Sequence, residues 1–568
     1  MSVFVKHGFW ALLFTLISCS PQPEADLIIY NAGVITLDDA RPAARAVAVS
    51  GDRIAAVGSD SLILTYRTAK TELIDAGGQT LIPGFIEGHA HFMGLGQALL
   101  TIDLRAAQSW PEIVALVDSA VQKSAPGTWI FGRGWHQEKW LRPPVPHVQG
   151  YPLHTSLSAV SPDNPVVLSH ASGHGIMANQ KAMALAGVNR ETATPDGGVI
   201  LRDASGQPTG IFLENAEALI LQAYRRRQGE LPADARRAMR LKMLRAATAH
   251  SLKNGITGFH DAGASFDDID FFRQAARSGE LKTRLWVMIA PNERLTPDKL
   301  KRYRMVGAEN NMLTVRAIKQ YADGALGSRG AWMLQPYSDR PGTSGQNTTP
   351  MDSILKVARL AYEADYQVCT HAIGDRGNRE VLDIYEQVLR GDTSRRWRIE
   401  HAQHLAVADI PRFAGLGVIA SVQTVHCTSD GLWVPARIGE ERAREGAYVW
   451  QKLLKSGARL ANGTDAPVER LSPLENYYAA VTRRLSDGSV FFGDQKLTRE
   501  EALKSLTLWN AYAAFEEKEK GSITAGKLAD FTLLSGNPLT VPEEKIPAIR
   551  VLMTVLGGSV EYKAPGQN

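Results

Sequence analysis

The sequence predicts an α/β protein: a (β/α)8 TIM barrel, with a small β-sandwich built from both chain ends and an insertion after barrel strand 1. Two observations lead to this fold class. Apolar strand-like runs alternate with helical patterns through residues 81–514, as a parallel barrel requires. Short β-branched runs broken by turns fill both chain ends, and neither end has enough strands to bury a core alone.

The composition is typical of a globular protein of 568 residues, with 44% hydrophobic and 21% charged residues. The formal net charge of +4 is small for this length, so we expect no nucleic acid partner. The partner that remains is a small-molecule substrate.

The N-terminus has the pattern of an export signal. Lys6 and His7 precede an apolar run over residues 8–17, and the sequence LISC ends at Cys19. Residues 1–19 therefore resemble a bacterial lipoprotein signal peptide, followed by a tether over 20–25. The prediction is an exported bacterial protein, anchored to the membrane through a lipid on Cys19 and facing the periplasm or cell surface. The alternative is an ordinary secretory signal with an incidental cysteine.

The chain ends predict the sandwich. Strand-like runs in the first part cover residues 27–30, 33–37, 46–49 and 54–58. The same pattern of short β-branched runs recurs at 529–534, 551–556 and 559–562. We therefore expect residues 26–80 and 515–562 to form one composite β-sandwich.

The section between them predicts the barrel. Its expected strands cover residues 81–89, 257–261, 285–290, 315–321, 367–371, 398–401, 418–423 and 459–465. An insertion of about residues 100–240 then follows the first strand, with strands of its own at 129–132 and 166–170. Because loops after barrel strands sit over the active site, this insertion is expected to shape the substrate pocket.

The first barrel strand ends in a candidate metal site. His89 and His91 are two residues apart, so in a strand both imidazoles point to the same face and can bind an ion of the zinc class. One such pair is weak evidence, because buried histidines often only donate hydrogen bonds. Further polar residues end later strands: Lys319, His371, His401 and Asp465. Singly, each also fits a structural role, such as a helix cap or a core hydrogen bond.

Together, these residues resemble a known pattern. Their order, on strands one, four, five, six and eight, resembles the amidohydrolase superfamily. The motifs YADGALGSR at 321–329, HAIGD at 371–375, EHAQ at 400–403 and GTDAP at 463–467 resemble amidohydrolase family 3, the YtcJ-like metal-dependent hydrolases. The resemblance covers residues 26–562.

The resemblance implies one or two divalent ions, with zinc the expected metal. His89 and His91 would hold one ion with Asp465, and His371 and His401 would hold the second. Lys319 would be a carbamate that bridges both. Burial beside two cations favours the neutral amine that reacts with CO2, and the product is an anion instead of a cation.

The expected reaction is hydrolysis of a non-peptide carbon–nitrogen bond, such as an N-acyl or N-formyl amide. A metal-activated hydroxide would attack, with Asp465 as general base and acid. Deamination or cyclic-amide hydrolysis is the alternative within the superfamily. A surface-tethered binding protein without turnover is the alternative of another class, although loss of function would be expected to remove at least one ligand position.

The substrate contacts are less sharply predicted. The candidates are Trp135, His136, His174, Asp323, Arg329 and His426. Relatives commonly carry aspartate where this chain has His136. Cys369 shares a strand face with His371 but has no evident activating base, so we interpret it as barrel packing.

Overall fold

The computed structural model describes residues 24–137, 140–171, 173 and 175–566. The predicted signal peptide, Cys19 and most of the tether lie outside these residues, and so does His174. No helix of the described part is long and apolar enough to cross a membrane.

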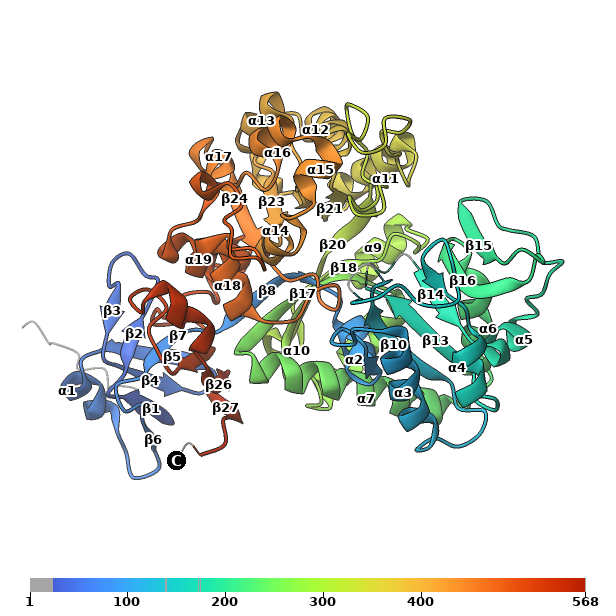
Figure 1. Ribbon diagram of the computed structural model, residues 1–568. Coiled ribbons are helices and arrows are strands. Elements are labelled where there is room, and N and C mark those ends of the chain that lie inside the picture. Colours follow the sequence, from blue (N-terminus) through green and yellow to red (C-terminus); the bar gives the residue numbers. More distant parts are fainter. Residues whose placement is uncertain (1–23, 138–139, 172, 174, 567–568) are drawn as a thin grey trace, which may run out of the picture.

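The centre of the molecule is a nearly closed parallel barrel (Figure 1). Its eight strands follow each other in chain order: β8 (Phe85–Ala90), β17 (Ile256–Ala264), β18 (Arg284–Ile289), β20 (Leu313–Tyr321), β21 (Gln367–Ala372), β22 (Arg398–His401), β23 (Ile419–Val422) and β24 (Arg459–Asn462). The first and last strands, β8 and β24, lie in contact. The predicted TIM-barrel fold is confirmed.

Helices between and after these strands bury one apolar face against the barrel. They include α8 (Phe266–Arg277), α11 (Met351–Glu363), α12 (Asp375–Leu389), α13 (Ile410–Leu416), α17 (Trp450–Lys455) and α18 (Pro473–Thr482). Helix α8 illustrates the local cause. Ser265 and Asp268 form a capping box at its start, and Ile269 and Phe272 are buried one helical turn apart.

Two sheets made from the chain ends pack beside the barrel. The first sheet has the order β5 (Arg53–Gly58), β4 (Ala46–Ser50), β1 (Leu27–Tyr30), β6 (Glu72–Asp75). The second has the order β27 (Ser559–Lys563), β26 (Val551–Leu556), β25 (Phe531–Leu534), β7 (Thr80–Pro83), β2 (Gly33–Ile35), β3 (Ala43–Ala44). Figure 1 shows the blue N-terminal and red C-terminal strands together. Val47, Leu81 and Phe531 share one apolar core between the sheets.

The prediction that the first barrel strand covers residues 81–89 is wrong at the start of this range. The structure divides it at Gly84 into β7, which belongs to the second sheet of the chain ends, and β8, which belongs to the barrel. Gly84 N donates to Asp530 O, whereas Phe85 N donates to Gly255 O, so the chain changes sheets here. A Cβ at position 84 would lie 2.2 Å from Thr257 Oγ1, so this close approach requires glycine.

The segment after β8 carries a third sheet, on the right of Figure 1. It lies between α2 (Phe92–Leu99) and α7 (Ala233–Lys253). Its order is β15 (Gly198–Arg202), β16 (Pro208–Glu214), β14 (Gly175–Ala178), β13 (Val166–His170), β10 (Ile130–Trp135), β9 (Ile102–Asp103). Helices α3 (Trp110–Val121), α4 (Thr155–Val160), α5 (Gln180–Ala186) and α6 (Glu217–Gly229) accompany it.

We predict that deleting residues 529–568 makes the protein insoluble. The deletion removes β25, so β7 loses its pairing partner and the core around Leu81 is exposed. It also removes Asp530, which forms a buried ion pair of 2.8 Å with Arg284 of the barrel. The soluble fraction after expression is the measurement, and a deletion of 564–568, which removes no strand, is the control. A soluble and folded 529–568 truncation would contradict the composite architecture.

Candidate metal centre

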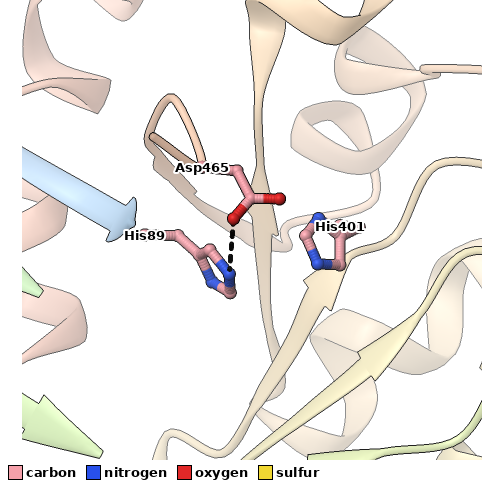
Figure 2. A group of neighbouring side chains, drawn as sticks. All are labelled: His89, His401 and Asp465. Carbon is pink, nitrogen blue, oxygen red and sulfur yellow. Dashed lines mark ion pairs between the residues drawn. The ribbon is translucent and has the colours of Figure 1, made fainter. Parts of the chain in front are cut away.

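Three predicted ligands converge at the carboxyl ends of the barrel strands. His89 lies in β8, His401 ends β22, and Asp465 follows β24 (Figure 2). One ligand atom from each lies within 4.8 Å of the others. All three residues are buried, at 8% exposure or less. A site at this end of a barrel, lined by two imidazoles and a carboxylate, has the donor set of a zinc-class centre.

Two of these ligands have an unusual backbone conformation, which sets the direction of their side chains. His401 has φ 76° and Asp465 has φ 57°, both in the left-handed region that non-glycine residues rarely adopt. Such a conformation costs about 1–3 kcal/mol and is kept only where surrounding contacts enforce it. Here Asp465 N donates to His89 O at 2.7 Å, which also connects β8 to the loop after β24.

The three ligands have protonation states that allow them to bind a cation. Burial lowers the pKa of His89 to about 4 and holds that of His401 well below its usual range. Burial alone would raise the pKa of Asp465, but its contact with His91 and the nearby imidazoles outweigh burial and keep it well below the usual value. The centre therefore presents neutral imidazoles and an ionised carboxylate at neutral pH.

Two buried polar atoms at the centre have no hydrogen-bond partner. They are Oδ1 of Asp465 and Nε2 of His371. His91 Nε2 lies 3.4 Å and His89 Nε2 3.6 Å from that Asp465 oxygen, so several donor atoms surround one point. Unsatisfied buried polar atoms are costly unless something binds them, so this donor set fits a divalent metal ion.

Lys319 and His371 lie beside this group. Lys319 is 1% exposed, and its Nζ is 3.3 Å from His89 Nε2. The rings of His371 and His401 are 4.4 Å apart, and burial lowers the pKa of His371 to about 3. All six predicted ligand positions are thus neighbours. The closest set, however, joins His401 to His89 and Asp465, although the resemblance placed His401 with the second ion.

A buried ion pair behind His89 was not predicted from the sequence. Glu400 accepts a hydrogen bond from His89 Nδ1, and Arg398 pairs with both Glu400 oxygens at 2.7 and 2.9 Å. Burial alone would raise the pKa of Glu400, but Arg398 and His89 hold it well below the usual value. The anion fixes the His89 tautomer, so the Nε2 lone pair faces the centre. Gln423 does the same for His401, since its Oε1 is 2.7 Å from His401 Nδ1.

We predict that Glu400→Gln lowers metal affinity about 10- to 100-fold, the usual cost of losing a partner behind a ligating histidine. It should also destabilise the protein by about 3–5 kcal/mol, because Arg398 would remain buried without its anion. Competition with a chelator and denaturant unfolding measure the two effects. Glu363→Gln, at an exposed position on α11, is the control. Parental metal affinity in folded Glu400→Gln would show that Glu400 does not orient His89.

A second buried carboxylate supports the loop after β24. Glu87 Oε1 accepts hydrogen bonds from the backbone N of His89 at 3.0 Å and of Thr464 at 2.8 Å. Burial raises its pKa to about 8. Because these contacts hold β8 against the loop that carries Asp465, Glu87 positions two ligands.

Two of the predicted substrate contacts, His426 and Asp323, lie beside the ligands. The His426 ring stacks on His401 at 6.2 Å, and its Nδ1 is 3.0 Å from Gln403 Nε2. Its Nε2 is buried without a hydrogen-bond partner. Asp323 is also near, 3.7 Å from His371 Nε2, but its oxygens accept from the backbone N of Trp332, Ile373 and Gly374. Asp323 therefore holds the loop after β21.

The remaining described candidates have contacts in other parts of the protein. Trp135 is 1% exposed in the core of the inserted sheet and donates to Leu168 O at 2.9 Å. His136 is half-buried, with its ring 4.5 Å from that of His170. Arg329 forms an ion pair of 2.8 Å with Asp339. Cys369 is a buried thiol whose pKa burial raises well above the usual value, so it is no thiolate nucleophile.

The barrel and its ligand set define a class of protein: a (β/α)8 enzyme scaffold with a metal centre at the carboxyl ends of its strands. The sequence matches the amidohydrolase family over residues 72–562. This chain therefore belongs to the amidohydrolase family, as the motifs predicted.

Individual relatives agree with this assignment. The putative amidohydrolase YtcJ of Bacillus subtilis (strain 168) is 30% identical over 94% of this chain and 99% of its own length. The N-substituted formamide deformylase of Arthrobacter pascens is 29% identical over 95% of this chain and 99% of its own. A crystal structure of an uncharacterised metal-dependent hydrolase from Pyrococcus horikoshii OT3 superposes with a TM-score of 0.75 and 26% identity, covering 91% of this chain and 99% of that one.

Proposed function

We propose that the protein hydrolyses a non-peptide amide, with an N-formyl or N-acyl amide as substrate and zinc as the metal. The observation that carries the proposal is an ionised Asp465 that lies beside neutral histidines in a buried centre. When bound there, a divalent ion lowers the pKa of water to about 7 and polarises a carbonyl. This chemistry suits attack on an amide carbon.

The protein side chains would then divide the remaining tasks. His89 and His401, fixed by Glu400 and Gln423, hold the ion in place. Asp465 accepts the proton of the attacking water and gives it to the leaving amine, because its carboxylate is ionised at neutral pH. His426 presents an unpartnered Nε2 beside His401 and is the best-placed residue to contact substrate.

The N-substituted formamide deformylase supports the formamide assignment, since similarity to it extends over 95% of this chain. Deamination and cyclic-amide hydrolysis remain the alternatives within the family. Binding without turnover is a weaker alternative, because all six ligand positions are present and adjacent.

A substrate panel on purified, zinc-replete protein tests the proposal. It should contain N-substituted formamides, longer N-acyl amides, cyclic amides and amino-heterocycles, with release of amine, carboxylate and ammonia measured separately. We expect amine and formate, or amine and a longer carboxylate, and no activity after metal removal. Release of ammonia from the heterocycles alone would establish deamination instead. Stoichiometric zinc with no turnover on any class would favour a binding protein.

We also propose that the protein is exported and anchored by a lipid on Cys19. The supporting pattern is the apolar run over residues 8–17 that ends near LISC. In a bacterial host, Cys19→Ser should move the protein from the membrane fraction to the soluble exported fraction. Cys427→Ser, at a buried thiol, is the control. Equal membrane partitioning of Cys19→Ser and the parent would exclude the lipid anchor.

A further inference from the structure

A large cavity lies between the barrel and the C-terminal strands, apart from the metal centre. Its volume is about 920 Å3. Its walls come from α14 (Thr424–Asp430), α18, β26 and the chain after β27. Val425, Tyr478 and Leu552 give these walls apolar surface. This size and lining are typical of small-molecule sites.

The cavity lining also includes basic side chains. Lys253, Arg484 and Arg550 line the cavity together with one carboxylate, Glu475. Arg484 is 3.6 Å from Glu543 and is therefore partly neutralised. Neither Lys253 nor Arg550 forms a salt bridge within the described part of the chain. With Arg484 paired to Glu543, the lining carries two further cations and one carboxylate, which is an excess of positive charge beside an apolar surface.

The cavity is distinct from the metal centre, although both use α14. Val425 and Thr428 of this helix line the cavity, whereas His426 stacks on His401 at the metal centre. A helix with its side chains is about 10 Å across, so one helix separates the two sites. None of the six predicted metal ligands lines the cavity.

We propose that this cavity is a binding site for an amphipathic organic carboxylate. The aliphatic part would lie against Val425, Tyr478 and Leu552, where its burial is favourable. The carboxylate would lie at Arg550 and Lys253, since the planar guanidinium matches a carboxylate in shape and charge. A neutral ligand of the same length would leave these cations unpaired.

Octanoate is a suitable probe, with binding to the zinc-replete protein measured by isothermal titration calorimetry. We expect one site per chain and about tenfold weaker binding of octan-1-ol. Arg550→Gln should also weaken octanoate binding about tenfold, the effect of one charge-assisted hydrogen bond. Its side chain is exposed, so the variant should fold. Ala564→Trp, which places an indole at the cavity wall, should abolish binding.

Arg359→Gln is the matched control, because this exposed arginine on α11 does not line the cavity. It should bind octanoate as the parent does. Parental affinity in both Arg550→Gln and Ala564→Trp would place octanoate elsewhere, including at the metal, and would overturn the proposal. Equal affinity for octanoate and octan-1-ol, or no octanoate binding by the parent, would overturn it too. The outcome does not depend on whether the protein hydrolyses amides.

Discussion

Asp465→Asn is expected to lower amide turnover by at least about 10^2- to 10^4-fold, the range for a lost general acid or base. Asparagine keeps the shape of the side chain but has no negative charge and accepts no proton. Because Asp465 also belongs to the closest ligand set, the variant should hold metal more weakly. Turnover and metal content per chain are the measurements.

Asp163→Asn is a suitable control, since Asp163 is exposed in the inserted segment. It should keep parental turnover and metal content. Thermal unfolding separates lost chemistry from lost structure, and we expect Asp465→Asn to stay folded because its backbone hydrogen bond to His89 remains. A folded Asp465→Asn protein with parental turnover would remove Asp465 from the reaction.

The barrel was predictable because its strands are apolar on both faces. The runs at 285–290 and 367–371 correspond to β18 and β21, with ends that differ by one residue. Parallel strands covered by helices read as continuous apolar runs, and the helices between them have a different period. The division at Gly84 was not predicted, because β7 and β8 form one apolar run and are separated by tertiary hydrogen bonds, of Gly84 to Asp530 and of Phe85 to Gly255.

The ligands were predicted from motifs, whereas the residues that orient them were not. Arg398 and Glu400 are two residues apart in β22, so their side chains share the face of the strand that points into the barrel. Two opposite charges at alternate positions of a predicted buried strand indicate an internal ion pair, and this signal was available in the sequence. The positive φ of His401 has no signal in the sequence, because non-glycine residues adopt such a φ only when tertiary contacts enforce it.

Lys319 decides between a bridged pair of ions and a single ion. We propose that Lys319 is carbamylated. A buried ammonium beside His89 would repel a divalent ion, whereas a carbamate would attract one. The competing structural interpretation is that Glu400 balances an unmodified Lys319, since the lysine charge contributes to the low pKa of Glu400.

If the carbamate forms, Lys319→Ala should empty at least one metal position and lower turnover by about 10^3-fold or more, because a metal contributes several kcal/mol to the transition state. Lys319→Arg should fail as severely, since a guanidinium stays cationic and cannot become a bridging anion. Short carboxylic acids with bicarbonate should partly restore Lys319→Ala, whereas amines should not. Lys356→Arg, on α11, is the control.

Metal content and turnover of Lys319→Arg settle the question. Full metal content with near-parental turnover would mean that Lys319 is a strand residue balanced by Glu400. His89, His401 and Asp465 would then hold one catalytic ion, the set whose donor atoms lie closest together. Loss of one of two metal equivalents, with rescue of Lys319→Ala by carboxylates, would instead require an anion at position 319 between two cations.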